Sequence, residues 1–186
     1  MRWAAVDFET ATHDRASACA LGVVVVEGGV EIERRSWLIR PPHNAYDPRN
    51  IEIHGISPQQ TATAPTFDAV WDEAMQVIGD RHLIAHNASF DVGVIRGGCD
   101  AYRMQPPSSP YLCTVQLARR TWPELGAHRL PIVAGHVGAE LDHHDALSDA
   151  AACSKILRAC IDAAGLDGVD ALVEHHALRE RRVDVR

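Results

Sequence analysis

Long hydrophobic runs are missing from this sequence. The longest purely aliphatic stretch is Val23 to Val26, whereas a membrane-spanning helix needs about 20 apolar residues. The N-terminus also lacks the layout of a signal peptide, because Met1-Arg2-Trp3 runs directly into a strand-like pattern. These two absences predict a cytoplasmic protein that does not associate with a membrane.

Paired cysteines and an excess of basic residues are missing as well. The five cysteines form no CxxC pair, and their odd number argues against a disulfide framework. The net charge is −7, whereas proteins that coat nucleic acid carry a basic surface. An enzyme that binds only a few nucleotides at a chain end is compatible with this charge, because bound metal ions can supply positive charge.

What is present is the composition of an ordinary globular protein. With 186 residues, of which 46% are hydrophobic and 23% are charged, the chain fits one domain with a substantial core. Alternating apolar residues bounded by turn signals predict five strands, at 3–8, 19–26, 30–39, 82–85 and 111–113.

Helical patterns occupy most of the rest of the chain. Amphipathic periodicity and capping residues predict helices at 66–78, just after Asn87, and at 114–121, 130–137, 145–164 and 169–182. The proline-rich segment 40–65 is expected to be a mostly irregular, functional loop. Together these elements predict an α/β fold, with a mixed five-stranded β-sheet flanked by α-helices.

Two carboxylates interrupt the first predicted strand. Asp7 and Glu9 lie two residues apart in Val6-Asp7-Phe8-Glu9-Thr10, so both side chains point to the same face. Burying two like charges together is costly unless a cation neutralises them, and hard divalent cations take oxygen ligands. The alternative is an edge strand whose polar face lies in water.

Two further segments repeat one arrangement near a predicted helix start. His86 precedes Asp91 by five residues, and His144 precedes Asp149 by the same distance. Five residues within one helix leave the two side chains about 140° apart, so each pair converges only if the histidine lies in the loop before the helix. Each aspartate alone could be a helix-start residue that the helix dipole favours. Together with the two acids of the first strand, they indicate a catalytic cluster.

These segments resemble the motifs of a known family. VDFET (6–10), HNASFD (86–91) and HDALSD (144–149) are similar to the three exonuclease motifs of the DEDD superfamily. The histidine of the last motif is typical of the DEDDh branch, which includes the proofreading subunit of bacterial DNA polymerase III and ribonuclease T. The resemblance covers about 3–165 of a single exonuclease domain, 1–186, and leaves 166–186 as a C-terminal helix or tail. Many relatives carry aspartate where Cys113 stands, outside the catalytic set.

The resemblance implies a ribonuclease H-like fold and a mechanism with two divalent cations, Mg²⁺ or Mn²⁺. By similarity, Asp7 would bridge both ions. Glu9 and Asp149 would complete the site of the ion that holds the attacking water, and Asp91 would hold the second ion.

The resemblance also assigns roles to the histidines. His144 would be the general base, because a neutral imidazole can take a proton from water at pH 7. Its neighbour His143 is expected to face another way. His86 is expected to orient the second motif or to contact the backbone.

Four further residues are expected at the substrate. By similarity, Thr10 would lie beside the terminal 3′ hydroxyl, and His54 and Ile56 would contact the terminal nucleotide. Phe90 is a candidate stacking surface for a terminal base; the alternative is that it packs in the helix core.

The function implied by the resemblance is a 3′→5′ exonuclease that releases nucleotides from the 3′ end of single-stranded nucleic acid, with DNA favoured over RNA. Two alternatives from the same class stay open: a proofreading subunit with a DNA polymerase as partner, and an RNA-processing exoribonuclease. A third is an inactive nucleic-acid-binding module, which the four intact acids and the histidine disfavour. The sequence sets no expectation for the oligomeric state.

Overall fold

A six-stranded mixed sheet forms the centre of the molecule. The computed structural model describes residues 1–179 and 181–184, and the strand order is β3-β2-β1-β4-β5-β6. The strands are β1 (Arg2–Thr10), β2 (Ala18–Glu27), β3 (Val30–Leu38), β4 (Leu83–Ala85), β5 (Pro110–Cys113) and β6 (Arg181–Arg182). The pairs β1–β4 and β4–β5 are parallel, and the other three pairs are antiparallel.

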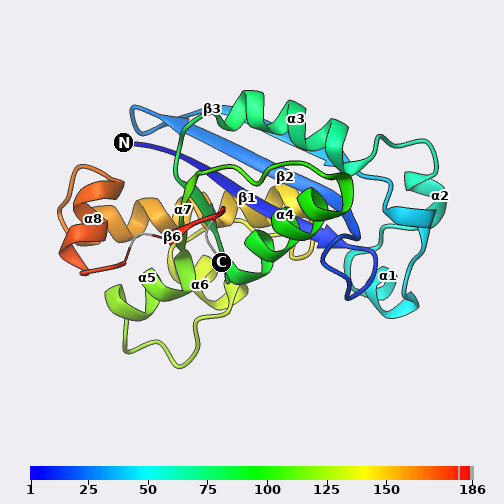
Figure 1. The fold of residues 1–186 in the computed structure, drawn as a ribbon. Helices are drawn as coiled ribbons and strands as arrows, with labels where there is room; N and C mark the ends of the chain where they lie inside the picture. The colour runs from blue at the N-terminus through cyan, green and yellow to red at the C-terminus, as the bar shows by residue number, and fades with distance from the viewer. Residues whose placement is uncertain (180, 185–186) are drawn as a thin grey trace.

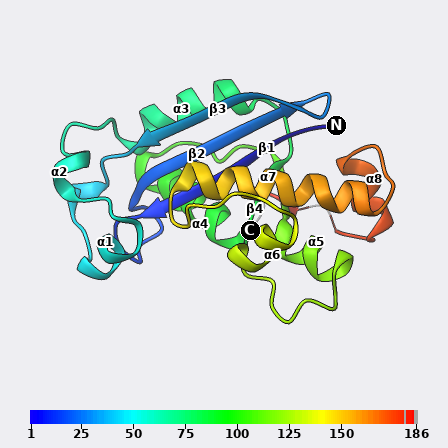
Figure 2. The same cartoon turned by 180° about the vertical axis from the view of Figure 1, so that it is seen from behind.

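Helices cover both faces of this sheet (Figures 1 and 2). One buried cluster joins the sheet to α3 (Phe67–Ile78) and α4 (Ser89–Tyr102). The other joins it to α5 (Thr114–Thr121), α6 (Leu130–His136), α7 (Ala146–Ala163) and α8 (Val169–His175). The predicted α/β class with a mixed, helix-flanked sheet is confirmed. No helix in the described part of the chain is long and apolar enough to cross a membrane.

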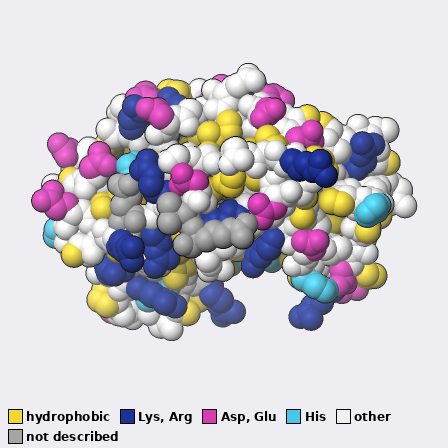
Figure 3. All heavy atoms as spheres, in the orientation of Figure 1, with side chains coloured by type: hydrophobic (Ala, Val, Ile, Leu, Met, Phe, Trp, Pro, Cys, Tyr) yellow, Lys and Arg dark blue, Asp and Glu magenta, His cyan; other side chains and the backbone are white. Residues whose placement is uncertain are grey.

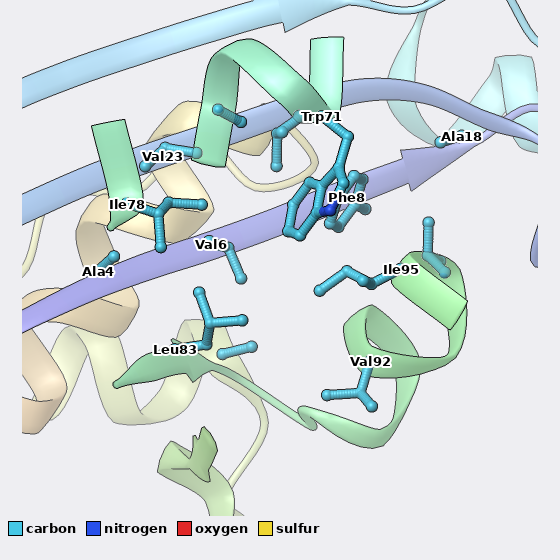
Figure 4. Packing of buried hydrophobic residues seen from close by; sticks show 14 of the residues in the cluster. Ala4, Val6, Phe8, Ala18, Val23, Trp71, Ile78, Leu83, Val92 and Ile95 are labelled. Atoms are coloured by element: carbon cyan, nitrogen blue, oxygen red, sulfur yellow. The ribbon is translucent and has the colours of Figure 1, made fainter. Parts of the chain in front are cut away.

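Strand β1 lies between the two helical layers and alternates between them. Its even-numbered apolar residues, Ala4, Val6 and Phe8, pack with α3 and α4 (Figure 4). The Phe8 ring lies 6.0 Å from Trp71, measured between ring centroids. The odd-numbered residues point to the opposite face, as the strand period requires. Asp7 and Glu9 therefore project on the α7 side of the sheet.

The segment 40–65 differs from its prediction. It contains a short 3₁₀ helix, η1 (Pro42–Asn44), and two α-helices, α1 (Pro48–His54) and α2 (Pro58–Thr61). Pro48 stands at the start of α1, where its missing N–H costs nothing. Asp47 caps the same helix by accepting a hydrogen bond from the Arg49 N–H, and Gly55, with φ 73°, ends it. The prolines therefore start helices here, and the prediction of a mostly irregular loop was wrong.

The C-terminal prediction was also wrong in part. A helix was expected over 169–182, but α8 ends at His175 and β6 forms at 181–182, which raises the strand count from five to six. Val183 is fully buried, and its N–H donates to the Ser109 carbonyl. Burial of Val183, its hydrogen bond to Ser109 and the pairing of β6 with β5 together hold the end of the described chain beside β5.

Helix α7 lies unusually close to the sheet at Gly22. A Cβ added to Gly22 would lie 2.2 Å from the Ala146 carbonyl oxygen, which is far inside van der Waals contact. Gly22 pairs with Asp7 across the β1–β2 ladder. The absence of a side chain at this position therefore allows the first turn of α7 to reach the acidic face of β1.

We predict that Gly22→Ala lowers the free energy of unfolding by about 1–3 kcal/mol, because the new methyl group forces α7 away from β2. Activity should fall further than stability explains, since the displaced helix carries Asp149. Denaturant unfolding and nuclease assays on the folded fraction measure the two effects. The control is Gly135→Ala, in an exposed part of α6 where an added Cβ meets nothing within 4 Å. If both variants changed the free energy of unfolding and the activity equally, the close contact between Gly22 and α7 would not be the cause.

Candidate active site

Three carboxylates converge where β1 meets the start of α7. Asp7, Glu9 and Asp149 each offer an oxygen, and the three atoms lie within 4.8 Å of one another. Asp91 joins the same cleft from the first turn of α4. It is held against β1 because the Phe8 N–H donates to Asp91 Oδ1 at 3.1 Å. Three separate elements thus bring the four predicted acids to one cleft.

The carboxylates are destabilised as anions by burial and by one another. Burial, followed by repulsion from Asp91 and Asp149, raises the pKa of Asp7 well above its usual value. Burial and the charge of Asp149 raise the pKa of Glu9 to about 8. Burial raises the pKa of Asp91 to about 7, although the Phe8 N–H counteracts it. The pKa of Asp149 is also raised by burial. At neutral pH the cluster therefore favours a bound cation or bound protons.

Asp149 provides a direct test of whether a cation fits. Its Oδ2 accepts hydrogen bonds from His143 Nδ1 at 3.0 Å and from the His144 N–H at 3.2 Å. Its Oδ1 is buried and has no hydrogen-bond partner among the described residues. An unpaired buried carboxylate oxygen is costly, and this one belongs to a carboxylate that lies beside two others. The all-oxygen donor set fits a hard divalent cation.

The two histidines of the third motif lie together, contrary to the expectation that His143 faces away. Their rings stack with centroids 3.8 Å apart and planes 19° from parallel. The cause is the backbone at His144, whose φ of 77° is left-handed, whereas side chains diverge along an extended chain. His144 Nδ1 lies 3.9 Å from Glu9 Oε1. Burial, followed by the neighbouring His143, lowers the pKa of His144, so its neutral form predominates at pH 7.

His54 and Thr10 form one wall of the cleft. His54 Nε2 lies 3.3 Å from the Thr10 carbonyl, and the Ile56 N–H donates to His54 Nδ1 at 3.0 Å. The same Thr10 carbonyl accepts a hydrogen bond from Asn50 Nδ2 at 2.7 Å. Ile56 is not among the described residues that line the cleft, whereas Ile53, one turn earlier on α1, lines it and is 47% exposed. Ile56 therefore holds His54 through its backbone.

Phe90 lies at the cleft with a cation on its ring. The Arg15 guanidinium lies 4.1 Å from the Phe90 ring centroid, and Arg15 Nη1 donates to the Phe90 carbonyl at 3.4 Å. Phe90 also packs, half-buried, against the apolar cluster. Both expectations for Phe90, core packing and a surface at the substrate cleft, are therefore compatible with its position.

His86 connects the second motif to the other wall of the cleft. Its Nε2–H donates to the His128 carbonyl at 2.9 Å, and its Nδ1 lies 2.8 Å from Thr114 Oγ1. Burial lowers the pKa of His86 to about 4, so the ring is neutral. The expected contact with backbone is confirmed, and it joins β4 to the loop before α6.

The cleft is large and extends beyond the acids. Its volume is about 1280 Å³, and residues not predicted from the motifs also line it, among them Asn50, Ile53, Asn87, Arg119, His128 and Arg129. Lys and Arg side chains gather at the lower left of the face in Figure 3, in the region of α5 and α6. The net charge of the chain gives no sign of this local concentration, although Arg119 and Arg120 stand side by side in the last turn of α5.

Comparison with known proteins identifies the group to which this architecture belongs. A family profile described as "Exonuclease" matches residues 4–157. The chain belongs to the exonuclease family. DNA polymerase III subunit epsilon of Aquifex aeolicus is 30% identical over 155 residues, which cover 81% of this chain and 76% of that protein. The predicted similarity to the exonuclease family that includes the proofreading subunit of bacterial DNA polymerase III is therefore confirmed.

Two other comparisons concern length and fold. A Mycobacterium tuberculosis protein named as a bifunctional exonuclease/endonuclease is 34% identical over 157 residues; the match covers 83% of this chain but 24% of that protein. The structure of exonuclease X in complex with 5′ overhanging duplex DNA aligns with a TM-score of 0.75 at 22% identity, over 94% of this chain and 99% of that one. This likeness confirms the ribonuclease H-like exonuclease fold.

We predict that the metal-free exonuclease becomes less stable as pH rises from about 6.5 to 8. The pKa of Glu9 is raised to about 8 on folding, so over this window folded Glu9 holds a proton that the unfolded carboxyl has lost, and its contribution to stability falls with increasing pH. Below this window the lowered pKa values of His86 and His144 act in the opposite direction. Thermal melting in chelator at several pH values measures the slope. Added Mn²⁺ should raise Tm, and should do so more at pH 8 than at pH 5.5, because the ligands must be deprotonated.

In the variant Glu9→Gln, Tm in chelator should depend less on pH, because the titrating carboxyl group has been removed. Glu52→Gln, an exposed acid on α1, is the matched control and should melt with the slope of the wild type. If Tm depends on pH in Glu9→Gln as it does in the wild type, the loss of stability with rising pH does not come from Glu9.

Proposed function

We propose that this chain is a 3′→5′ exonuclease that removes nucleotides from the 3′ end of single-stranded DNA. Two divalent cations, Mg²⁺ or Mn²⁺, would be held by Asp7, Glu9, Asp91 and Asp149. The observation that supports this most directly is the convergence of these acids in an open cleft, where the buried Asp149 Oδ1 has no hydrogen-bond partner in the described part of the chain. When bound, such ions would supply the positive charge that neutralises the acids and the scissile phosphate.

His144 would be the general base. Its ring is 40% exposed at the cleft, and its Nδ1 lies near Glu9. The lowered pKa keeps a nitrogen lone pair available at pH 7, which is the requirement for accepting a proton from an attacking water. The His144 N–H holds Asp149 at the same time. His144 would thus position Asp149 through its backbone N–H and supply the general base through its ring.

The walls of the cleft would bind the terminal nucleotide. Thr10 and His54 form a rigid wall beside the acids, and Ile53 supplies the apolar contact that was expected of Ile56. The Phe90 ring carries the Arg15 guanidinium on one face, and stacking of a base against the ring would not depend on the base's identity. Arg129 lines the opposite side, where it can meet a backbone phosphate.

DNA is favoured as the substrate, because one relative is a DNA polymerase subunit and a fold neighbour binds duplex DNA with an overhang. The same relative supports the alternative of a proofreading subunit that acts with a DNA polymerase. An RNA-processing exoribonuclease is the other alternative, since recognition of RNA depends on a contact to the 2′ hydroxyl. An inactive binding module is disfavoured, because all four acids and His144 lie together.

We predict that a linear single-stranded DNA is degraded while a closed circle of the same sequence survives. The cleft binds one chain end at the acids, and a circle offers no end. The measurement is release of mononucleotides and of acid-soluble label in Mg²⁺ or Mn²⁺, with loss of activity in excess EDTA. Equal cutting of circle and linear strand would show an endonuclease, and full activity in EDTA would contradict the metal sites.

Parallel digestion of single-stranded RNA and of a duplex with a mismatched 3′ end separates the alternatives. The proposed function predicts that single-stranded DNA is degraded fastest. RNA degraded faster would identify an exoribonuclease. A strong preference for the mismatched end would favour a proofreading role.

We predict that His144→Ala lowers kcat by about 10²–10⁴, the usual contribution of a general base. The acids remain, so the stabilisation by Mn²⁺ should persist in thermal melts. His143→Ala retains the base and loses one hydrogen bond to Asp149, so kcat should fall less. If His143→Ala were the more damaged variant, the base would be assigned to the wrong histidine.

A further inference from the structure

A second group of metal-ligating atoms lies beside the four acids. His143, His144 and Asp149 each offer one ligand atom, and the three atoms lie within 4.8 Å of one another. The group shares Asp149 with the acidic cluster but contributes two imidazole nitrogens. The proposed hydrolytic mechanism uses one histidine as the base, and His143 takes part in it only through its hydrogen bond to Asp149.

The backbone places both rings on the same side. The left-handed conformation of His144 stacks its ring on that of His143, and the His143 Nδ1–H already donates to Asp149 Oδ2. Both side chains are accessible from the cleft, because His143 is 39% and His144 is 40% exposed. Neither ring is packed into the core, so the rings can turn out of the stack, which they must do for both nitrogens to bind one ion.

The chemistry of this donor set differs from that of the acids. Two nitrogens and one carboxylate oxygen, with a fourth position open, are a ligand set of Zn²⁺, whereas Mg²⁺ prefers oxygen alone. Zinc would replace the hydrogen between His143 Nδ1 and Asp149, and the ring would take up a proton at Nε2, so that the neutral imidazole changes tautomer with no net loss of a proton. The set can therefore select zinc in the presence of excess magnesium.

We propose that His143, His144 and Asp149 form an inhibitory zinc site at the edge of the catalytic cleft. Zinc bound there occupies the nitrogen lone pair of His144 and holds Asp149, so it blocks hydrolysis even when Mg²⁺ is saturating. The inhibition rests on the proposed role of His144, whereas the binding of zinc rests only on the three side chains.

Binding is tested separately from activity. Wild-type protein in saturating Mg²⁺ is titrated with Zn²⁺ by calorimetry, and with Co²⁺ by absorption spectroscopy, which distinguishes a four-coordinate nitrogen-containing site from an octahedral oxygen site. The expected result is one site that excess Mg²⁺ does not displace. Zinc that Mg²⁺ displaces completely, or a purely octahedral cobalt spectrum, would overturn the proposal.

Two variants locate the ion. His143→Ala removes a ligand of the proposed site and should weaken zinc binding by at least about 10-fold, the loss that even supporting residues of metal sites cause. Asp7→Asn disrupts the acidic cluster but keeps all three ligands, so zinc should still bind. Zinc binding that survives in His143→Ala and disappears in Asp7→Asn would place the ion among the acids and overturn the proposal. Circular dichroism verifies that both variants are folded.

Inhibition is then measured as the ratio of activity with and without zinc, which cancels any change in basal activity. The zinc concentration for half inhibition should rise at least about 10-fold in His143→Ala. If zinc binds at the three residues but leaves the wild-type rate unchanged, the inhibitory role is wrong, and so is the assignment of His144 as the base. A failure of zinc to bind leaves the proposed exonuclease function unaffected.

Discussion

The contact between Gly22 and the first turn of α7 is the constraint on which the rest of the site depends. Helix α7 carries Asp149, whereas Asp7 and Glu9 lie on β1, and the two elements meet only because β2 has no side chain at Gly22. A methyl group there would overlap the helix backbone. Packing of α7 on this face of the sheet therefore positions the third motif. The distance between Asp149 and the two acids of β1 depends on this packing.

This geometry is costly for the isolated protein. Folding buries carboxylates on a central strand and a helix start, and their pKa values rise because each anion is desolvated and meets the others. If these two strand positions served only to stabilise the sheet, apolar residues would be expected there instead of Asp7 and Glu9. The cost is explained if a divalent cation neutralises the cluster, because a cation that binds only the folded state stabilises that state. Stability and catalysis then depend on the same ions.

Much of this architecture could be predicted from the sequence, because its signals are local. Period-two patterns located β1 to β5, and the spacing of the motifs placed the acids on one strand and two helix starts. The errors have particular physical causes. Pro48 begins a helix, since the first helical position needs no N–H. Strand β6 has two residues and forms through its pairing with β5, so no local sequence pattern predicts it. Apart from these errors, the left-handed Gly55 ends α1 beside the cleft, where Ile53 lines the cleft and Ile56 donates its backbone N–H to His54.

His144 shows how a backbone conformation can connect several roles. A non-glycine residue with φ of 77° costs roughly 1–3 kcal/mol unless its surroundings hold it. Here the His144 N–H and the His143 ring both donate to Asp149 Oδ2, and these bonds hold the loop in that conformation. Because both donors take the same oxygen, Oδ1 has no hydrogen-bond partner among the residues that the structure describes, in a carboxylate that lies beside Asp7 and Glu9. The left-handed residue thus holds the Asp149 carboxylate through its N–H and places its own ring near Glu9. The same turn of the chain brings the ring of His143 against that of His144.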